Sequence, residues 1–363
     1  MPPCRVPRTS PHSGSRSLSI RCNGLPMTPQ RRTASDSDPD PTASGLNAEL
    51  AAEALPGVVV RAYGKFFTVQ LADGRELLST VKGVLKRHRR GTDLVAVGDK
   101  VSVRDVGEGE GRIESVAPRT RTLSRLARHT QDVEQIILAN PDQALFLFAV
   151  RDPEPHLRLL DRFLVMAESR SLPALIGVNK MDLDVAVAVG EPSLAQSMFG
   201  RYEQIYPVFY LSAKTGQGIE GLRQALSGEI TAVAGPSGVG KSSLLNVLDP
   251  TRKRTIGTIS AATGKGRHTT TATVLHRIPG KAQTFVADTP GIRALSLQGV
   301  TTDELDQFFP EMRPFLGECR YADCAHLSEP GCAVLAAVDA GEIGRERYES
   351  YASLRRGEMP DES

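Results

Sequence analysis

The chain has 363 residues, enough for two or three domains, and 40% of them are hydrophobic, as is usual for globular proteins. Nowhere do the roughly 20 uninterrupted apolar residues of a membrane-spanning helix occur, so we expect no membrane association and a cytoplasmic location. The net charge of +2 neither favours nor excludes nucleic acid as a partner. Five cysteines without an apolar signal segment favour a reducing compartment, where grouped thiols bind metal more often than they form disulfides.

Residues 1–50 are rich in Ser, Pro and Arg, contain no acidic residue before Asp36 and show no apolar periodicity. This composition predicts a disordered tail. It also resembles an organelle transit peptide, while a flexible tail, or translation that starts at Met27, accounts for the same residues.

Residues 51–120 predict a small β-barrel, because short stretches of alternating apolar and polar residues are separated by turn signals. The expected strands are Val58–Val60, Phe66–Leu71, Glu76–Val81 and Lys100–Val103, with a tight turn at residues 72–74. A basic segment follows the third strand. It places five fixed positive charges within nine residues, which suits either a phosphate backbone or a solvated loop: Lys82, Lys86, Arg87, Arg89 and Arg90, together with His88.

Residues 121–300 alternate apolar strands with amphipathic helices, which is typical of a mostly parallel α/β sheet covered on both faces. Helices are expected at residues 157–170 and 219–226. The expected strands cover residues 144–150, 175–178, 210–211, 230–234 and 284–287. The second of these ends at Asn179, and ligands of such sheets bind at the carboxyl ends of the strands.

A phosphate-binding loop lies between the strand at 230–234 and a helix expected to begin at Ser243. Its glycines allow successive backbone N–H groups to point at phosphates, Lys241 neutralises the β- and γ-phosphates, and Ser242 ligates Mg²⁺. The nucleotide-binding residues expected here are Gly235, Pro236, Ser237, Gly238, Val239, Gly240, Lys241, Ser242 and Ser243.

The base is predicted by the sequence Asn179-Lys180-Met181-Asp182, because its aspartate can accept both the N1–H and the N2 amino hydrogen of guanine. We expect Asn179 to buttress the loop and Lys180 to pack along the base. Ser212-Ala213-Lys214 resembles the loop whose backbone N–H faces the guanine O6. A P-loop kinase or ATPase is the alternative enzyme class, and the guanine motif disfavours it.

Two further segments have the positions of GTPase switches. Asp288-Thr289-Pro290-Gly291 matches the motif that holds Mg²⁺ through water and senses the γ-phosphate. The next residue is Ile292, where many GTPases carry a water-orienting Gln, so intrinsic hydrolysis should be slow or use another group. In residues 266–271, Thr270 is expected to reach Mg²⁺. His268 is either the residue that orients water or an exposed loop residue.

Four potential metal ligands follow within fourteen residues, with the spacing C-x4-C-x-H-x5-C: Cys319, Cys324, His326 and Cys332. Three thiolates and an imidazole form a closed tetrahedral Zn²⁺ site with no position free for catalysis. We therefore expect one structural zinc ion in a small helical subdomain at residues 301–363. Unligated buried cysteines are the alternative.

The guanine motif precedes the phosphate loop, the reverse of the order in an ordinary GTPase. This order predicts a circularly permuted GTPase domain in which the helix at 219–226 joins the original termini. The second switch then leads directly toward the metal ligands. We therefore expect a movement of this switch with the nucleotide state to reach the C-terminal subdomain and change its binding to a partner.

These motifs together resemble the ribosome small subunit-dependent GTPase A family from about residue 56 onward: the barrel, NKMD, SAK, GPSGVGKSS, GRHTTT, DTPGIR and the cysteine-histidine motif. The resemblance implies that the barrel is an OB-fold and that the protein binds the 30S ribosomal subunit and its 16S rRNA late in assembly. It implies that the subunit stimulates hydrolysis of GTP to GDP, that release follows, and that His268 is the catalytic histidine. The family pattern gives no role for the tail.

We expect a monomer. A third possibility is a zinc-stabilised RNA-binding module, in which the nucleotide serves as a structural switch.

Overall fold

The computed structural model describes residues 54–81, 94–126, 134–185, 191–250, 273–280, 283–288 and 300–358. The predicted tail, the basic segment at residues 82–90, and the switch residues His268, Thr270 and Gly291 lie outside the described residues.

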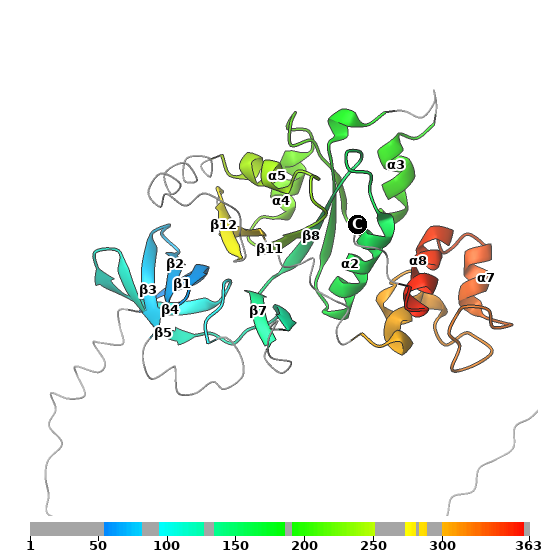
Figure 1. Cartoon of the computed structure of the whole chain (residues 1–363), viewed down its shortest axis with the longest axis horizontal. Helices are drawn as coiled ribbons and strands as arrows, with labels where there is room; N and C mark the ends of the chain where they lie inside the picture. The colour runs from blue at the N-terminus through cyan, green and yellow to red at the C-terminus, as the bar shows by residue number, and fades with distance from the viewer. Residues whose placement is uncertain are drawn as a thin grey trace, which may run out of the picture. The chain divides into compact units, whose positions relative to one another are not determined.

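Five strands form a closed barrel in the order β1-β2-β3-β5-β4 (Figure 1). They are β1 (Ala54–Tyr63), β2 (Phe66–Leu71), β3 (Glu76–Val81), β4 (Lys100–Gly107) and β5 (Glu110–Val116). β1 pairs antiparallel with both β2 and β4, whereas β3 and β5 are parallel, which is the strand arrangement of an OB-fold. Alternate side chains fill the interior, among them Val59, Val69 and Ile113. The bounds predicted for β2 and β3 are confirmed, and β1 and β4 are longer than predicted.

A two-stranded antiparallel ribbon follows the barrel: β6 (Thr122–Leu126) and β7 (Glu134–Ala139). Leu123 and Leu138 of this ribbon are buried in the same hydrophobic core as Val60 of the barrel and Phe146 of the central sheet. The ribbon and one face of β1 thus belong to the core on one side of the central sheet, separate from the core inside the barrel.

The central sheet has six strands in the order β10-β9-β8-β11-β13-β12. β8 (Gln143–Ala149), β9 (Ala174–Asn179), β10 (Val208–Tyr210), β11 (Ile230–Ala234) and β13 (Thr284–Asp288) are parallel, and β12 (Val274–Ile278) is antiparallel to β13. Every residue of β8, β9 and β11 is buried, because helices cover both faces of the sheet.

Among the described residues, α2 and α3 cover one face of the central sheet, and α4 and α5 cover the other. α2 (Leu157–Ser169) and α3 (Leu194–Phe199) contribute Phe163 and Phe199 to one hydrophobic core. α4 (Ile219–Ala225) and α5 (Lys241–Leu248) contribute Leu222 and Leu245 to the other. Two short 3-10 helices, η2 (Met181–Leu183) and η3 (Gly200–Tyr202), follow β9 and α3.

The chain passes from β8 outward to β9 and β10, then returns through α4 to β11, which pairs with β8. The strand order therefore reverses between β8 and β11, and ligands of open α/β sheets bind at such a reversal. The phosphate loop follows β11 and the guanine motif follows β9, so both predicted motifs lie at the carboxyl edge of the sheet.

The C-terminal subdomain comprises η5 (Thr302–Phe308), η6 (Arg313–Phe315), α7 (Ala333–Asp339) and α8 (Arg345–Arg355). Its core includes Phe309, Met312 and Tyr351, and Val165 of α2 belongs to the same core, so the subdomain packs against the helix layer of the central sheet. Among the described residues, none of the helices has both the length and the apolar character that crossing a membrane requires.

Candidate nucleotide and metal sites

Close packing surrounds the glycines of the phosphate loop. Gly235 and Gly240 have positive φ angles of 153° and 96°. A Cβ atom on Gly235 would lie 2.0 Å from the carbonyl oxygen of Leu147 in β8, and one on Gly240 would lie 2.4 Å from Nδ2 of Asn179. No side chain fits at either position, so the sequence places glycine where the loop backbone approaches its neighbours.

The phosphate loop leads into α5, which begins at Lys241, two residues before the predicted start at Ser243. Nζ of Lys241 donates hydrogen bonds to the carbonyl oxygens of Gly235 (2.9 Å) and Pro236 (2.6 Å). Ser242 and Ser243 are exposed in the first turn. The ammonium group thus lies within the loop, beside the helix N-terminus that favours an anion.

Asn179 connects the phosphate loop to the loop that follows β10. Its Nδ2 donates to the carbonyl oxygen of Val239 (2.8 Å), and its Oδ1 accepts from the backbone N–H of Ala213 (3.0 Å). The side chain is 2% exposed. The N–H of Met181 also donates to the carbonyl of Leu211 (3.0 Å). These bonds link three loops from different parts of the sequence.

The carboxylate of Asp182 is held by two neighbours on the loop after β10. Ser212 Oγ donates to Asp182 Oδ1 (2.7 Å), and Lys214 Nζ lies 3.3 Å from Oδ2. The Ser212 hydrogen bond, together with Lys214, lowers the pKa of Asp182 below its usual value. The carboxylate is therefore ionised and oriented, as a group that accepts two hydrogen bonds must be. Lys180, which has a positive φ of 64°, donates from Nζ to the carbonyl oxygen of Asp152.

Asp288 is the last residue of β13, where it pairs with Val233 of β11 and Val274 of β12. This register places its backbone at the same sheet edge as the phosphate loop. The other predicted switch residues lie outside the described residues.

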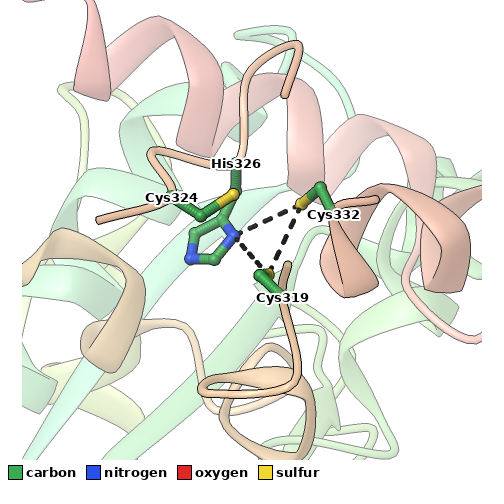
Figure 2. A group of neighbouring side chains, drawn as sticks. All are labelled: Cys319, Cys324, His326 and Cys332. Carbon is green, nitrogen blue, oxygen red and sulfur yellow. Dashed lines mark hydrogen bonds between the residues drawn. The ribbon is translucent and has the colours of Figure 1, made fainter. Parts of the chain in front are cut away.

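The four predicted metal ligands come together. Their ligand atoms all lie within 4.8 Å of one another (Figure 2). His326 Nδ1 is 3.5 Å from Cys319 Sγ and 3.4 Å from Cys332 Sγ, and the two sulfur atoms are 3.9 Å apart. A tetrahedral Zn²⁺ with ordinary bond lengths requires about 3.6 Å between nitrogen and sulfur and about 3.8 Å between sulfurs. Both the donor set and its spacing fit this ion.

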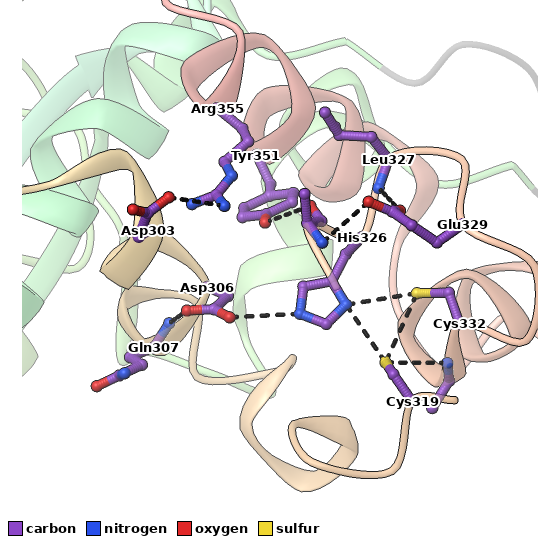
Figure 3. A network of polar contacts seen from close by, with 12 residues as sticks. Asp303, Asp306, Gln307, Cys319, His326, Leu327, Glu329, Cys332, Tyr351 and Arg355 are labelled. Atoms are coloured by element: carbon purple, nitrogen blue, oxygen red, sulfur yellow. Dashed lines mark hydrogen bonds and ion pairs between the residues drawn. The ribbon is translucent and has the colours of Figure 1, made fainter. Parts of the chain in front are cut away.

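Polar contacts orient the ligand side chains (Figure 3). His326 Nε2 lies 3.3 Å from Asp306 Oδ2, the arrangement that fixes the ring orientation of many metal-binding histidines. Backbone N–H groups of Ala333 and Leu335 donate to Cys319 Sγ and Cys332 Sγ, both at 3.4 Å. Burial raises the pKa of the Cys324 thiol to about 12, so a thiolate at this position needs a compensating positive charge.

The ligand loop is held by Glu329 and by two tyrosines of α8. The carboxylate of Glu329 accepts from the backbone N–H groups of Ala325 (3.0 Å), Leu327 (2.8 Å) and Ser328 (3.0 Å). Tyr351 donates to the carbonyl oxygen of Ala325 and Tyr348 to that of His326, both at 2.9 Å. The loop conformation is therefore stabilised by groups outside the ligand set.

The sequence did not predict two of these supporting residues, Asp306 and Glu329. Asp306 precedes the ligand motif and lies in another short helix, so spacing carries no signal for it. Glu329 lies within the last gap of the motif, where an acidic residue beside Ser328 and Pro330 is a weak signal for a turn whose backbone N–H groups bind the carboxylate.

Comparison with known proteins relates these sites to a family. The family model described as RsgA GTPase matches residues 116–298. A protein of Gemmatimonas aurantiaca named small ribosomal subunit biogenesis GTPase RsgA is 43% identical over 82% of this chain and 96% of its own length. This chain belongs to the RsgA GTPase family. It is therefore a GTPase, and the predicted enzyme class and family resemblance are confirmed.

A second relative and two solved structures are also similar to this chain. The protein of the same name from Moorella thermoacetica is 42% identical over 83% of this chain and 96% of its own length. The crystal structure of YjeQ from Thermotoga maritima is similar with a TM-score of 0.68 and 32% identity, covering 85% of this chain and 99% of that one. YloQ, described as a circularly permuted GTPase, has a TM-score of 0.64 and 27% identity, covering 85% and 97%. The predicted fold class, a permuted α/β GTPase domain with an N-terminal barrel and a C-terminal cysteine-histidine cluster, is confirmed.

Proposed function

We propose that this GTPase acts in biogenesis of the small ribosomal subunit: it binds the 30S subunit late in assembly, hydrolyses GTP under stimulation by the subunit, and leaves after hydrolysis. The observation that carries the proposal is the similarity to two proteins named small ribosomal subunit biogenesis GTPase, 43% and 42% identical, each covered over 96% of its length. The partner in this proposal is the 16S rRNA of the subunit. The protein acts as a cytoplasmic monomer.

In this proposal, Asp182 reads guanine. Its carboxylate is ionised and held by Ser212 and Lys214, so two acceptor oxygens are available to the N1–H and N2 amino groups. Asn179 supports the reading by holding the guanine loop against the phosphate loop. Lys180 packs along the base, and the loop Ser212-Ala213-Lys214 approaches its O6 atom.

The phosphate loop, Gly235 to Ser243, holds the phosphates. Lys241 already lies within hydrogen-bonding distance of two loop carbonyls, so a small movement of its flexible side chain brings the charge to the β- and γ-phosphates. Ser242, Thr270 and Asp288 would hold Mg²⁺, which would neutralise the developing phosphate charge. Gly291 senses the γ-phosphate, and His268 orients the attacking water.

We propose further that Cys319, Cys324, His326 and Cys332 hold one structural Zn²⁺. The separations of 3.4 to 3.9 Å and the Asp306 contact to His326 support this assignment. The proposed division into domains is a tail at 1–50, a barrel at 51–120, the GTPase domain at 121–300 and the zinc subdomain at 301–363.

The test is steady-state GTP hydrolysis by the purified full chain, alone, with isolated 30S subunits, and with 50S subunits as the control. We expect a large stimulation by 30S subunits and little by 50S subunits. Equal rates in all three reactions would overturn the ribosomal part of the proposal while leaving the GTPase intact.

Two variants make that test specific. Lys241→Ala should abolish tight GTP binding because it removes the charge that neutralises the phosphates. His268→Ala should bind GTP normally but lose most of the stimulation. Unchanged stimulated turnover in the second variant would remove His268 from the proposed catalytic set.

A further inference from the structure

The segment that precedes β10 contacts the C-terminal subdomain. This segment, residues 200–207, begins with η3 and leads through β10 into the loop that is expected to face the guanine base. Oε2 of Glu346 in α8 lies 3.2 Å from Nη1 of Arg201 in η3. The guanidinium of the next residue, Arg347, lies 5.5 Å from the ring centroid of Tyr202. Two neighbouring residues of α8 thus contact two neighbouring residues of η3.

Asp161 of α2 completes this contact. Its Oδ1 atom accepts hydrogen bonds from the hydroxyl of Tyr202 (2.8 Å) and from Nη1 of Arg347 (2.6 Å). Arg347 also donates to both carboxylate oxygens of Glu311, at 2.6 and 3.2 Å. The side chains of Asp161, Tyr202 and Arg347 are buried. We call Asp161, Tyr202, Glu311 and Arg347 the α8 clamp.

Hydrogen bonds connect the α8 clamp to the loop that holds Asp182. The carbonyl oxygen of Tyr202 accepts from the backbone N–H groups three and four positions later (2.9 and 2.8 Å), which forms the turn before β10. Oε1 of Glu203, the next residue, accepts from the hydroxyl of Tyr210, the last residue of β10 (2.8 Å). Two positions further on, Ser212 donates to Asp182 (2.7 Å). A continuous path of contacts therefore leads from α8 to the Asp182 carboxylate.

The α8 clamp adds direction to a contact that apolar packing already makes. Val165 of α2 belongs to the core of the C-terminal subdomain, so packing alone joins the two parts of the protein. Apolar side chains of the same volume hold surfaces together at least as well as a buried guanidinium and its carboxylates, whose desolvation is costly. Hydrogen bonds, in contrast, fix the distance and the angle between their partners. The α8 clamp thus fixes where η3 lies relative to α2 and α8.

We propose that the α8 clamp positions the guanine loop, so that the orientation of the Asp182 carboxylate depends on the C-terminal subdomain. Tyr202 and Arg347 are positioning residues in this inference, since they act through Glu203, Tyr210 and Ser212. The inference rests on the proposed role of Asp182 in reading guanine. Guanine affinity then depends on a subdomain that lies outside the predicted nucleotide-binding residues.

Base selectivity reports the orientation of Asp182. Inosine diphosphate (IDP) lacks the N2 amino group of GDP but has the same phosphates, so the ratio of the two affinities isolates a contact that the carboxylate makes. A displaced carboxylate weakens GDP binding more than IDP binding. A change that loosens the whole nucleotide site weakens both equally.

The first test is equilibrium binding of GDP and IDP, by competition with a fluorescent GDP, to the full-length parent protein and its Tyr202→Phe and Arg347→Met variants. We expect each variant to lower the preference for GDP over IDP by roughly 2-fold to 30-fold. The combined effect of both changes should be smaller than the product of the two, because they break the same contact. Tyr202→Phe removes a single hydroxyl, so it decides the test by itself if Arg347→Met does not fold.

Hydrogen exchange shows where the structure changes. In Tyr202→Phe, exchange should rise in residues 208–215, which include β10 and the guanine loop. It should stay unchanged in the phosphate loop at residues 235–243, because that loop follows another strand.

Ser353→Ala and Arg345→Met are the matched controls on α8. Ser353 is buried and its hydroxyl donates to the carbonyl oxygen of Glu358 (3.2 Å), while Arg345 pairs with Asp339 (3.3 Å). These bonds lie within the C-terminal subdomain. Both variants should therefore keep the GDP preference of the parent protein.

An unchanged preference in Tyr202→Phe and Arg347→Met would overturn the inference, and so would an equal loss of GDP and IDP affinity. Increased exchange spread evenly over residues 208–215 and the phosphate loop would overturn it as well. Asp182→Asn should abolish the preference and gives its full size. A parent protein that binds GDP and IDP equally would overturn the guanine role of Asp182, and with it this inference.

Discussion

The metal cluster and the nucleotide edge are both built from loops, yet they are stabilised in different ways. At the metal cluster, three thiols and an imidazole face one another within 4.8 Å, and burial disfavours the thiolate of Cys324. At the nucleotide edge, Asn179, Asp182 and Lys241 already have hydrogen-bonding partners in neighbouring loops.

The two regions differ in how far their structure depends on a bound ligand. A site whose donors face one another requires a cation to offset their mutual repulsion and desolvation. A site whose loops are linked to each other by hydrogen bonds keeps its shape when the ligand leaves, which a GTPase that exchanges GDP for GTP requires. The following predictions test this contrast.

The largest effect is expected from metal removal. Binding of structural Zn²⁺ contributes about 10–16 kcal/mol in small zinc domains, so a strong chelator should unfold the C-terminal subdomain. Hydrogen exchange of the full chain should show loss of protection in α7 and α8 and little change in β8 and β11. Elemental analysis of the untreated protein should give one zinc per chain.

Two controls sharpen that experiment. Cys324→Ser should reproduce the effect of the chelator without any added reagent. Removal of nucleotide by extensive dialysis should leave protection unchanged in both regions. Equal loss of protection in the C-terminal subdomain and at the nucleotide edge would contradict a difference in ligand dependence between the two regions. An absence of any loss in α7 and α8 would contradict it as well.

The second prediction concerns the contact between the C-terminal subdomain and α2. Arg347 of α8 binds Asp161 of α2 (2.6 Å) and Glu311 (2.6 Å), and its guanidinium lies 4.7 Å from the ring centroid of Phe309. Arg347 and Asp161 side chains are 2% and 3% exposed. Arg347→Met leaves the buried Asp161 and the largely buried Glu311 without their cation, which should destabilise the protein by about 3–5 kcal/mol in chemical denaturation.

Arg345 provides the matched control on the same helix. Its side chain is 63% exposed and pairs with Asp339 at 3.3 Å, so Arg345→Met should change stability by less than about 1 kcal/mol. Similar losses in the two variants would show that burial of the ion pair does not determine its contribution. Adding Asp161→Asn and Glu311→Gln to Arg347→Met should restore part of the stability.

This network shows why the sequence predicts the candidate sites but not the residues that support them. The metal ligands lie within fourteen residues and the phosphate loop is one continuous segment, so spacing alone predicted both. Asp161 and Arg347 are 186 positions apart, and α8 has the composition of a polar surface helix. Their contact depends on how two elements pack, which local patterns do not encode.

Packing between elements also explains why some strands, including β6, β7 and β12, are not predicted by the sequence. β6 and β7 form a ribbon whose buried residues pack with β1 and the central sheet, and β12 is an edge strand that contains His276 and Arg277. Neither shows a strong alternation of its own. Strands such as β8 and β11, which are buried on both faces, were predicted because their apolar character is continuous.

The third prediction tests the links between loops at the nucleotide edge. Asn179→Ala leaves the carbonyl of Val239 and the N–H of Ala213 without their partner, at a cost of about 1–3 kcal/mol for each buried group. GDP affinity should fall roughly tenfold to a hundredfold while the C-terminal subdomain stays folded. Equilibrium binding of a fluorescent GDP measures the first effect and hydrogen exchange the second. Asn246→Ala on α5 is the control, and a comparable loss there would refute the specific role of Asn179.

The smallest effect is expected at Glu329, which supports the metal loop without binding the metal. Burial opposes its ionisation, but hydrogen bonds from the N–H groups of Ser328, Leu327 and Ala325 lower its pKa to about 2. Because this lies below the usual value of about 4.3, the stabilisation is complete above that pH and is lost as the pH falls toward 2. Glu329→Gln should therefore lower stability by about 1 kcal/mol, equally at pH values between about 6 and 8. A difference that changes across this range would mean that another titrating group, and not the Glu329 carboxylate, holds the loop.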